Sequence, residues 1–476
     1  MLFDTPVYFV FLTIVVIGYW RLRRSGQNVL LLCASYLFYG WWDWRFLSLI
    51  LISTLVDYCC AHLIDRSDNP IKRRTALIVS VGLNLGFLGF FKYCNFFIDS
   101  FASLLATLNI PVSDTALQIL LPPGISFYTF QAVAYIVDVY QRRLKPADSL
   151  VDYALFISLF PHLIAGPIQR PSHLLPQVQA ARVFDIDRFY GGLQLIALGL
   201  FRKVVIADNC ALLADAAFNG KLGEPNLAVL AIGTYAFAWQ IYGDFSGYSD
   251  IARGSAQLMG FHFMVNFRQP YLATSLQDFW RRWHISLSTW LRDYLYISLG
   301  GNRHGELKTY RNLMTTMLLG GLWHGANWTF VVWGGIHGAG LAVERFVRRM
   351  FGLEATDSAN QPSSSFLSVW MSRIFIFHLV CLSWVFFRAT SIDAAFHMLS
   401  GIGNLVWIPE YGTAFILLIA FSLPMFLLDL LNERRGEEYV FEGLPAMRRA
   451  AVAMSLMVAT LIFAGSSANA FIYFQF

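Results

Sequence analysis

Two histidines, His284 and His324, have the surroundings in this sequence that are best suited to chemistry. His324 lies in a 31-residue stretch, Leu313 to Val343, that contains no Asp, Glu, Lys or Arg. A helix crosses the hydrocarbon core of a membrane with about 20 residues, so this stretch is long enough to be tilted, broken or re-entrant. At about 1.5 Å per residue, His324 lies roughly 18 Å from the start of the stretch. An ionisable residue at that depth predicts a functional role, and the alternative is a neutral histidine bonded between helices.

His284 lies upstream in the segment FWRRWHISLSTWLRDYLYISLGGN, residues Phe279 to Asn302. When Trp280 to Tyr294 are projected at about 100° per residue, aromatic and apolar side chains fill one face and Arg281 and Arg292 the other. This pattern predicts one amphipathic helix at the membrane interface, with His284 at the boundary of the two faces. The alternative is an aromatic-belt helix in which the histidine is incidental.

An imidazole within reach of a hydroxyl group can act as a general base. It takes the hydroxyl proton in the transition state, which contributes typically 10² to 10⁴ in rate. Gly320, Gly321 and Gly325 would allow another backbone or an extended ligand to come close to His324. The sequence therefore predicts a tunnel with a base inside. A cysteine nucleophile is disfavoured, because no cysteine lies between Ala211 and Val380.

The composition indicates what kind of element holds these histidines. Hydrophobic residues make up 57% of the 476 residues and charged residues 14%, whereas a soluble protein has about 25% charged residues. The mean hydropathy is +0.52. We therefore expect an all-α polytopic membrane protein, with about 11 to 13 membrane-spanning or re-entrant helices in one integral domain over residues 1–476. Basic inner loops and anionic lipid headgroups account for the net charge of +5, so no nucleic-acid partner is expected.

Basic clusters predict the orientation in the membrane. Arg21 to Arg24 and Lys72 to Arg74 are separated by two apolar segments, so both clusters are expected on the cytoplasmic side. The same rule applied near the other end predicts that both termini are extracytoplasmic. Pro6 to Trp20 is expected to be a retained first span, and Glu354 to Ser365 a polar loop. The six cysteines show no metal-ligand spacing, so no metal site is expected.

Long segments of the chain resemble one known family. They are LPPGISFYTFQAVAYIVDVY (121–140), FPHLIAGPIQR (160–170), YGDFSGYSDIARG (242–254), the segment 279–302, LLGGLWHGANW (318–328) and FIYFQF (471–476). Together they closely resemble the membrane-bound O-acyltransferase family, in particular its bacterial branch that serves alginate O-acetylation. Matches of this length are highly specific.

The resemblance implies an enzyme that moves an acetyl group from cytoplasmic acetyl-CoA, with no tightly bound cofactor. The catalytic histidine of the family matches His324, and a second histidine tied to activity matches His284, which places the catalytic segment at residues 279–338. The resemblance further implies an extracytoplasmic acetyltransferase as partner. The partner decorates an exopolysaccharide, for which alginate is favoured and cellulose or another surface polymer is the alternative. An acceptor that is a lipid, a teichoic acid or a protein stays open within the family.

Supporting roles are assigned to polar groups that are near the histidines in sequence or in family-like segments. Candidate donors to an oxyanion or positioning groups are Asn327, Trp323 and Trp328. Candidates for binding the phosphates of the donor are Arg281, Arg282 and Arg292, with headgroup anchoring as the alternative. Candidates for positioning the acceptor are Asp244, Ser246 and Tyr248, with capping of a helix end as the alternative.

On a continuous helix His337 would face away from His324, because 13 residues turn the helix by about 220°, so His337 is expected to be structural. A transporter is the alternative from another class, since many spans and intramembrane polar groups would also suit one. Intramembrane acidic residues are sparse, however, and the chain shows no paired halves.

Overall fold

The computed structural model describes residues 1–110, 117, 119–164, 166–352, 365–441 and 443–464. Over these residues the secondary structure is helical and contains no strand. The expected polar loop from Glu354 to Ser365 lies outside the described residues except for Ser365, and so does the segment 471–476. The all-α expectation is confirmed for the described part of the chain.

The helices divide into two compact units, the first of which comprises Met1–Ile196 and Tyr248–Met264. Its helices are α1 (Pro6–Tyr19), α2 (Arg24–Asp43), η1 (Trp44–Phe46), α3 (Leu47–Arg66), α4 (Pro70–Leu88), η2 (Gly89–Tyr93), α5 (Cys94–Thr107), α6 (Ile125–Tyr140), α7 (Leu150–Ser158), α8 (Phe160–Leu163), α9 (Pro171–Gln179) and most of α10 (Ile186–Leu200). Helix α3 packs against α4 and α6, and α2 packs against α7.

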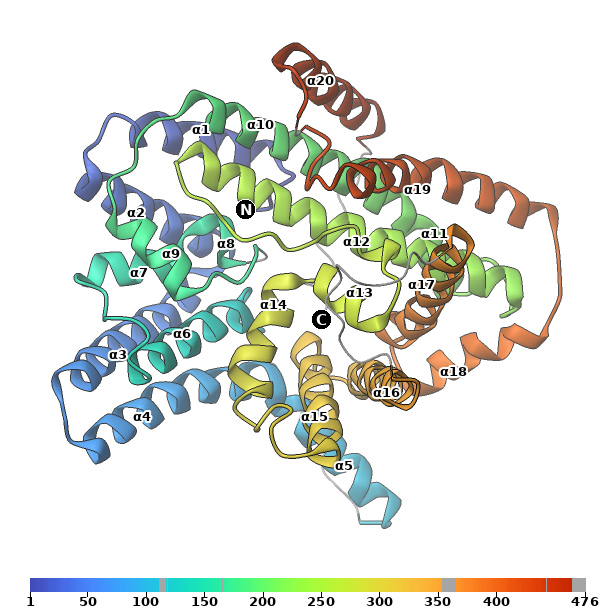
Figure 1. Cartoon of the computed structure of the whole chain (residues 1–476). Helices are drawn as coiled ribbons and strands as arrows, with labels where there is room; N and C mark the ends of the chain where they lie inside the picture. Colours follow the sequence, from blue (N-terminus) through green and yellow to red (C-terminus); the bar gives the residue numbers. More distant parts are fainter. Residues whose placement is uncertain (111–116, 118, 165, 353–364, 442, 465–476) are drawn as a thin grey trace. The chain divides into compact units, whose positions relative to one another are not determined.

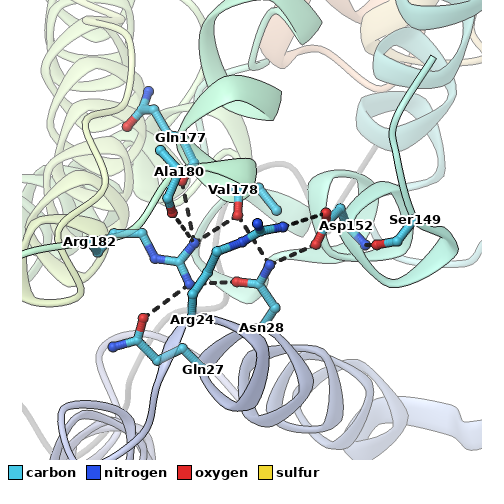
Figure 2. A network of polar contacts seen from close by, with 9 residues as sticks. All are labelled: Arg24, Gln27, Asn28, Ser149, Asp152, Gln177, Val178, Ala180 and Arg182. Atoms are coloured by element: carbon cyan, nitrogen blue, oxygen red, sulfur yellow. Dashed lines mark hydrogen bonds and ion pairs between the residues drawn. The ribbon is translucent and has the colours of Figure 1, made fainter.

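A polar network ties the start of α2 to the segment that follows α9 (Figure 2). The Arg182 guanidinium donates to Asn28 Oδ1 at 2.5 Å and to the carbonyl of Val178 at 2.8 Å. Asn28 in turn donates to Asp152 Oδ1 at 2.8 Å, and Arg24 donates to Oδ2 of the same carboxylate at 2.9 Å. Arg24 of the basic cluster 21–24 therefore has an internal partner, which fixes helix α2 against α7.

The second unit comprises Ala197–Gly247 and Val265–Phe476 and contains both candidate histidines. Its helices are η3 (Phe201–Ala207), α11 (Asp208–Phe218), most of α12 (Leu227–Leu258), η4 (Pro270–Leu272), α13 (Leu276–Arg282), α14 (Ile285–Trp290), η5 (Leu291–Tyr296), α15 (Glu306–His324), α16 (Trp328–Met350), α17 (Phe366–Arg388), α18 (Ile392–Ser400), η6 (Gly401–Gly403), α19 (Pro409–Arg435) and α20 (Ala446–Phe463). The expectation of a single integral domain stays a prediction.

Several helices are long and apolar enough to cross a membrane. Five stretches of the described chain meet this description, namely Arg24–Arg66, Pro70–Thr107, Phe366–Arg388, Pro409–Arg435 and Ala446–Phe463, and Pro6–Tyr19 is a shorter apolar helix. They support a multi-pass membrane protein. The predicted total of 11 to 13 spans is not decided by them and stays a prediction.

Helices α15 and α16 pack against each other (Figure 1), and glycines let them meet backbone against backbone. A Cβ atom on Gly334 would lie 2.3 Å from the carbonyl oxygen of Met317, and one on Gly321 would lie 2.2 Å from that of Phe330. Both distances are too short for any side chain, so only glycine allows this approach. The close contact places the end of α15, with His324, beside the first turns of α16.

Candidate active site

His284 lies at a break between two short helices. Ser275 caps the start of α13, where its hydroxyl oxygen accepts from the backbone N–H of Asp278 at 3.0 Å. The helix ends at Arg282, Trp283 is extended, and His284 has the left-handed backbone angles φ 42° and ψ 53° before α14 begins. The prediction of one amphipathic helix from Trp280 to Tyr294 is therefore wrong. A non-glycine residue in the left-handed region interrupts it.

The aromatic face that was expected to meet lipid is packed inside the protein. Trp283 is 1% exposed, Leu287 0% and Trp290 7%. The Trp283 ring lies 5.1 Å from that of Trp384 on α17 and 5.6 Å from that of Phe279. Tertiary packing and not the bilayer therefore accounts for this row of aromatic residues.

His324 is the last residue of α15, and a short turn reverses the chain behind it. Gly325 is extended, and a Cβ atom there would lie 2.1 Å from the Phe330 ring. Asn327 caps α16, since its side-chain oxygen accepts from the backbone N–H of Thr329 at 3.0 Å. The amide of Asn327 also donates to the carbonyl of Thr390 at 3.2 Å. His324 is therefore held at a helix end by a turn that requires glycine.

The two histidines lie near each other inside the second unit. Their ring centres are 6.2 Å apart, and His284 is 0% exposed and His324 3%. Around His324 the rings of Trp323 and Trp333 lie at 5.1 Å and that of Phe387 at 5.4 Å, and the Phe245 ring lies 4.6 Å from that of His284. The site is thus a pair of imidazoles enclosed by aromatic rings.

This enclosure favours the neutral form of His284, which lies outside the candidate spans. Burial lowers the pKa of His284 to about 3, because the cation would lose its hydration. A neutral imidazole keeps one nitrogen as a proton acceptor, as a general base requires. The hydrogen-bond partner of the ring is the amide of Asn266, at 3.1 Å from Nδ1. Sequence reasoning missed Asn266, because no motif spacing connects it to a histidine 18 residues later.

His337 lies on α16 and His324 ends α15, so the two do not share the continuous helix that was assumed when His337 was predicted to face away from His324. The chain reverses between α15 and α16, and the Trp333 ring lies 5.1 Å from that of His324 and 4.9 Å from that of His337. His337 is 1% exposed, and its Nε2 bonds to the Ser383 hydroxyl at 3.0 Å. His337 thus lies close to the site, and its structural role stays a prediction.

The three arginines proposed to bind the phosphates of the donor differ in their ion pairs and exposure. Arg282 donates to Asp278 at 2.8 Å and to Glu433 at 2.7 Å, and Arg373 donates to the same Glu433 at 3.2 Å. Arg292 pairs with its neighbour Asp293 at 2.7 Å. Arg281 is exposed. These ion pairs would compete with a phosphate at Arg282 and Arg292, and the donor-binding role of all three stays a prediction.

The acceptor candidates have internal partners as well. Asp244 pairs with the buried ammonium of Lys203 at 3.0 Å, and the Ser246 hydroxyl donates to the carbonyl of Tyr242 at 2.6 Å. Tyr248 belongs to the first unit, where its ring stacks on Phe3 at 5.6 Å. Trp328, an oxyanion candidate, is 52% exposed, whereas Trp323 is 3% exposed. None of these roles is decided by the contacts, and they stay predictions.

Comparison with known proteins places this geometry in a family. The family model of the membrane-bound O-acyltransferases matches residues 147–389, which include both histidines. The chain is 44% identical over 403 residues to the probable alginate O-acetylase AlgI of Azotobacter vinelandii. The aligned region covers 84% of this chain and 77% of that protein.

Relatives that are named for other acceptors, peptidoglycan and teichoic acid, are also similar to this chain. The peptidoglycan O-acetyltransferase of Helicobacter pylori is 36% identical over 85% of this chain and 80% of its own length. The teichoic acid D-alanyltransferase of Streptococcus thermophilus is 31% identical over 52% of this chain and 63% of its own length. Transport, the alternative from another class, finds no support among these relatives. The chain belongs to the membrane-bound O-acyltransferase family and is a multi-pass membrane O-acyltransferase.

Proposed function

We propose that this enzyme takes an acetyl group from acetyl-CoA at the cytoplasmic face and passes it across the membrane for O-acetylation of an exopolysaccharide. The observation that carries the proposal is the buried pair His284 and His324, with ring centres 6.2 Å apart. Alginate is the favoured polymer, because a relative named as an alginate O-acetylase is 44% identical over most of the chain. Acetylation of cellulose or another surface polymer is the second candidate, since a relative named for peptidoglycan is also similar.

His324 acts as the general base in this proposal. The acceptor hydroxyl attacks the thioester carbonyl, a C–O bond forms, and the imidazole takes the hydroxyl proton. The C–S bond then breaks and the imidazole returns the proton to the departing CoA thiolate. Asn327, Trp323 and Trp328 are the candidate donors to the oxyanion. The hydroxyl belongs either to the polymer or to a nucleophile of a partner protein.

The helices surround a tunnel that joins the two faces of the bacterial inner membrane, with both termini extracytoplasmic. Arg281, Arg282 and Arg292 are the arginine candidates for the CoA phosphates, and Arg281 is exposed. An extracytoplasmic acetyltransferase receives the acetyl group and modifies the polymer. No other cofactor is required, because the thioester supplies the driving force.

A donor-choice assay tests the proposed substrate. The wild-type protein in lipid nanodiscs is given radiolabelled acetyl-CoA or palmitoyl-CoA, with alginate and partner protein present or absent. We expect release of free CoA thiol and transfer of label from acetyl-CoA only, increased by the acceptor. Transfer of the palmitoyl group with acetyl-CoA left intact would contradict the proposal.

A further inference from the structure

Asn266 holds the left-handed turn that carries His284. The residue lies between α12 and η4 and is 1% exposed. Its backbone carbonyl accepts from the N–H of Ile285 at 2.9 Å. Its side-chain Oδ1 lies 3.3 Å from the backbone N of Ser286, 2.9 Å from the Ser286 hydroxyl and 3.1 Å from Nδ1 of His284. One asparagine therefore contacts both the backbone after His284 and its ring.

These contacts determine which ring nitrogen carries the proton. The backbone N–H of Ser286 can only donate, so the atom of Asn266 that faces it is the carbonyl oxygen and not the amide nitrogen. A carbonyl oxygen can only accept, so Nδ1 of His284 must donate to it. In a neutral imidazole the other nitrogen, Nε2, then keeps its lone pair.

Nε2 is left without a hydrogen-bond partner among the residues that the structure describes. It is fully buried, in a ring that packs edge-on against Phe245 at 4.6 Å and lies 6.2 Å from the ring of His324. A buried nitrogen without a partner costs free energy, and such atoms in native proteins call for an explanation. A reacting hydroxyl group would supply the missing donor.

The backbone supports the same reading. A residue other than glycine in the left-handed region is strained and persists where the surrounding structure holds it. Here the hydrogen bonds of Asn266 to Ile285 and Ser286 hold the turn. An amide also orients the ring without adding the charge that a carboxylate would bring, so it leaves the imidazole neutral.

We propose that Asn266 is a positioning residue for acyl transfer, which fixes His284 as the Nδ1–H tautomer and leaves Nε2 as its basic nitrogen. The role in acyl transfer rests on the proposed function. The tautomer rests on the hydrogen bonds alone.

Nuclear magnetic resonance of the full-length protein in lipid, labelled with ¹⁵N and ¹³C in histidine, measures the tautomer directly. The signal of His284 is assigned by its loss in His284→Gln. We expect a neutral ring at about pH 7, with the proton on Nδ1. A proton on Nε2, or an imidazolium at that pH, would overturn the proposal whatever the enzymatic activity.

Substitution of Asn266 tests its role in the reaction. Asn266→Ala is expected to lower kcat by about tenfold or more with an unchanged KM for acetyl-CoA, because the ring of His284 would no longer be held in one orientation beside His324. Asn266→Asp keeps the acceptor but adds a negative charge, which raises the pKa of His284. The variant should therefore have a high kcat at alkaline pH. As the pH is lowered, its kcat should fall at a higher pH than that of the wild type.

Asn226→Ala is the matched control. Asn226 is a buried asparagine of the same unit, 3% exposed, and its side chain accepts from the N–H groups of Ala228 and Val229 at the start of α12. We expect Asn226→Ala to lower stability without a change in the pH profile of kcat.

Equal values of kcat and equal pH profiles of kcat for wild type, Asn266→Ala and Asn266→Asp would overturn the proposal. If the wild type transfers no acetyl group while the ring is the Nδ1–H form, the proposed function and the role of Asn266 in the reaction fail, and the tautomer stands.

Discussion

At the scale of single residues, His324 could be singled out because an ionisable side chain in a long uncharged stretch is conspicuous, whereas His284 was singled out by its aromatic and basic segment and by the family resemblance. Their proximity could not be predicted, since it depends on the left-handed backbone of His284 and the turn behind His324. Asn266 was not predicted either. Its two roles, at the backbone of Ser286 and at the ring of His284, arise only from the fold.

The lowered pKa of His284 predicts a dependence of stability on pH. The group has an ordinary pKa of 6.5 and a folded value of about 3, so below about pH 6.5 the unfolded chain binds a proton that the folded protein does not. The stability that the neutral, buried His284 contributes is therefore fully present above about pH 6.5. It is lost as the pH falls toward the pKa of about 3 in the folded protein. Thermal unfolding in nanodiscs between about pH 7 and pH 5 should show a steeper loss for wild type than for His284→Gln. Parallel curves for the two proteins would contradict this assignment.

At the scale of helices, the break next to His284 was not predicted. Trp280 to Tyr294 was predicted to be one interfacial amphipathic helix, but these residues are divided among the end of α13, α14 and η5. Helical periodicity does not reveal that break, because the hydrogen bonds that stabilise it come from Asn266, outside the segment. Glycines near His324 did predict a close approach, and Gly321 indeed meets α16 at the backbone.

The hairpin of α15 and α16 predicts different effects of the same substitution at adjacent positions. Gly334→Ala would place a Cβ atom 2.3 Å from the carbonyl oxygen of Met317, whereas Gly335→Ala would meet only a side-chain atom of Leu318 at 3.5 Å. We expect Gly334→Ala to lower the free energy of unfolding by about 1–3 kcal/mol and to reduce activity by displacing His324. Thermal unfolding and acetyl transfer measure both effects. Gly335→Ala should resemble wild type, and equal effects of the two variants would contradict the packing.

At the scale of the whole molecule, composition was sufficient to predict a helical membrane protein. With 57% hydrophobic and 14% charged residues, the chain cannot bury its apolar surface in the manner of a soluble protein. The number of spans is harder to predict, because buried polar side chains such as Arg202, Lys203 and Asp244 lie in helices outside the five candidate spans and reduce their apolar character. Hydropathy averages cannot separate such a helix from one that lies outside the bilayer.

The proposed division of labour predicts separate effects on binding and on polymer acetylation. Removal of the extracytoplasmic acetyltransferase should abolish acetylation of the polymer in cells. The isolated membrane protein should still bind acetyl-CoA, because the proposed donor site belongs to this chain. Polymer analysis and equilibrium binding measure the two quantities. Loss of acetyl-CoA binding in the protein purified without its partner would contradict the division.

The central claim is that His324 is the base of an acetyl-transfer site, and one comparison of variants tests it most directly. Label transfer from acetyl-CoA is measured for wild type, His324→Ala and His337→Gln in nanodiscs, together with thermal unfolding. His337 is a buried histidine of the neighbouring helix α16, and a glutamine can keep its bond to Ser383. We predict that His324→Ala loses at least about 100-fold in kcat while it stays folded, and that His337→Gln retains most of its activity. A folded His324→Ala protein with the turnover of wild type would contradict the account.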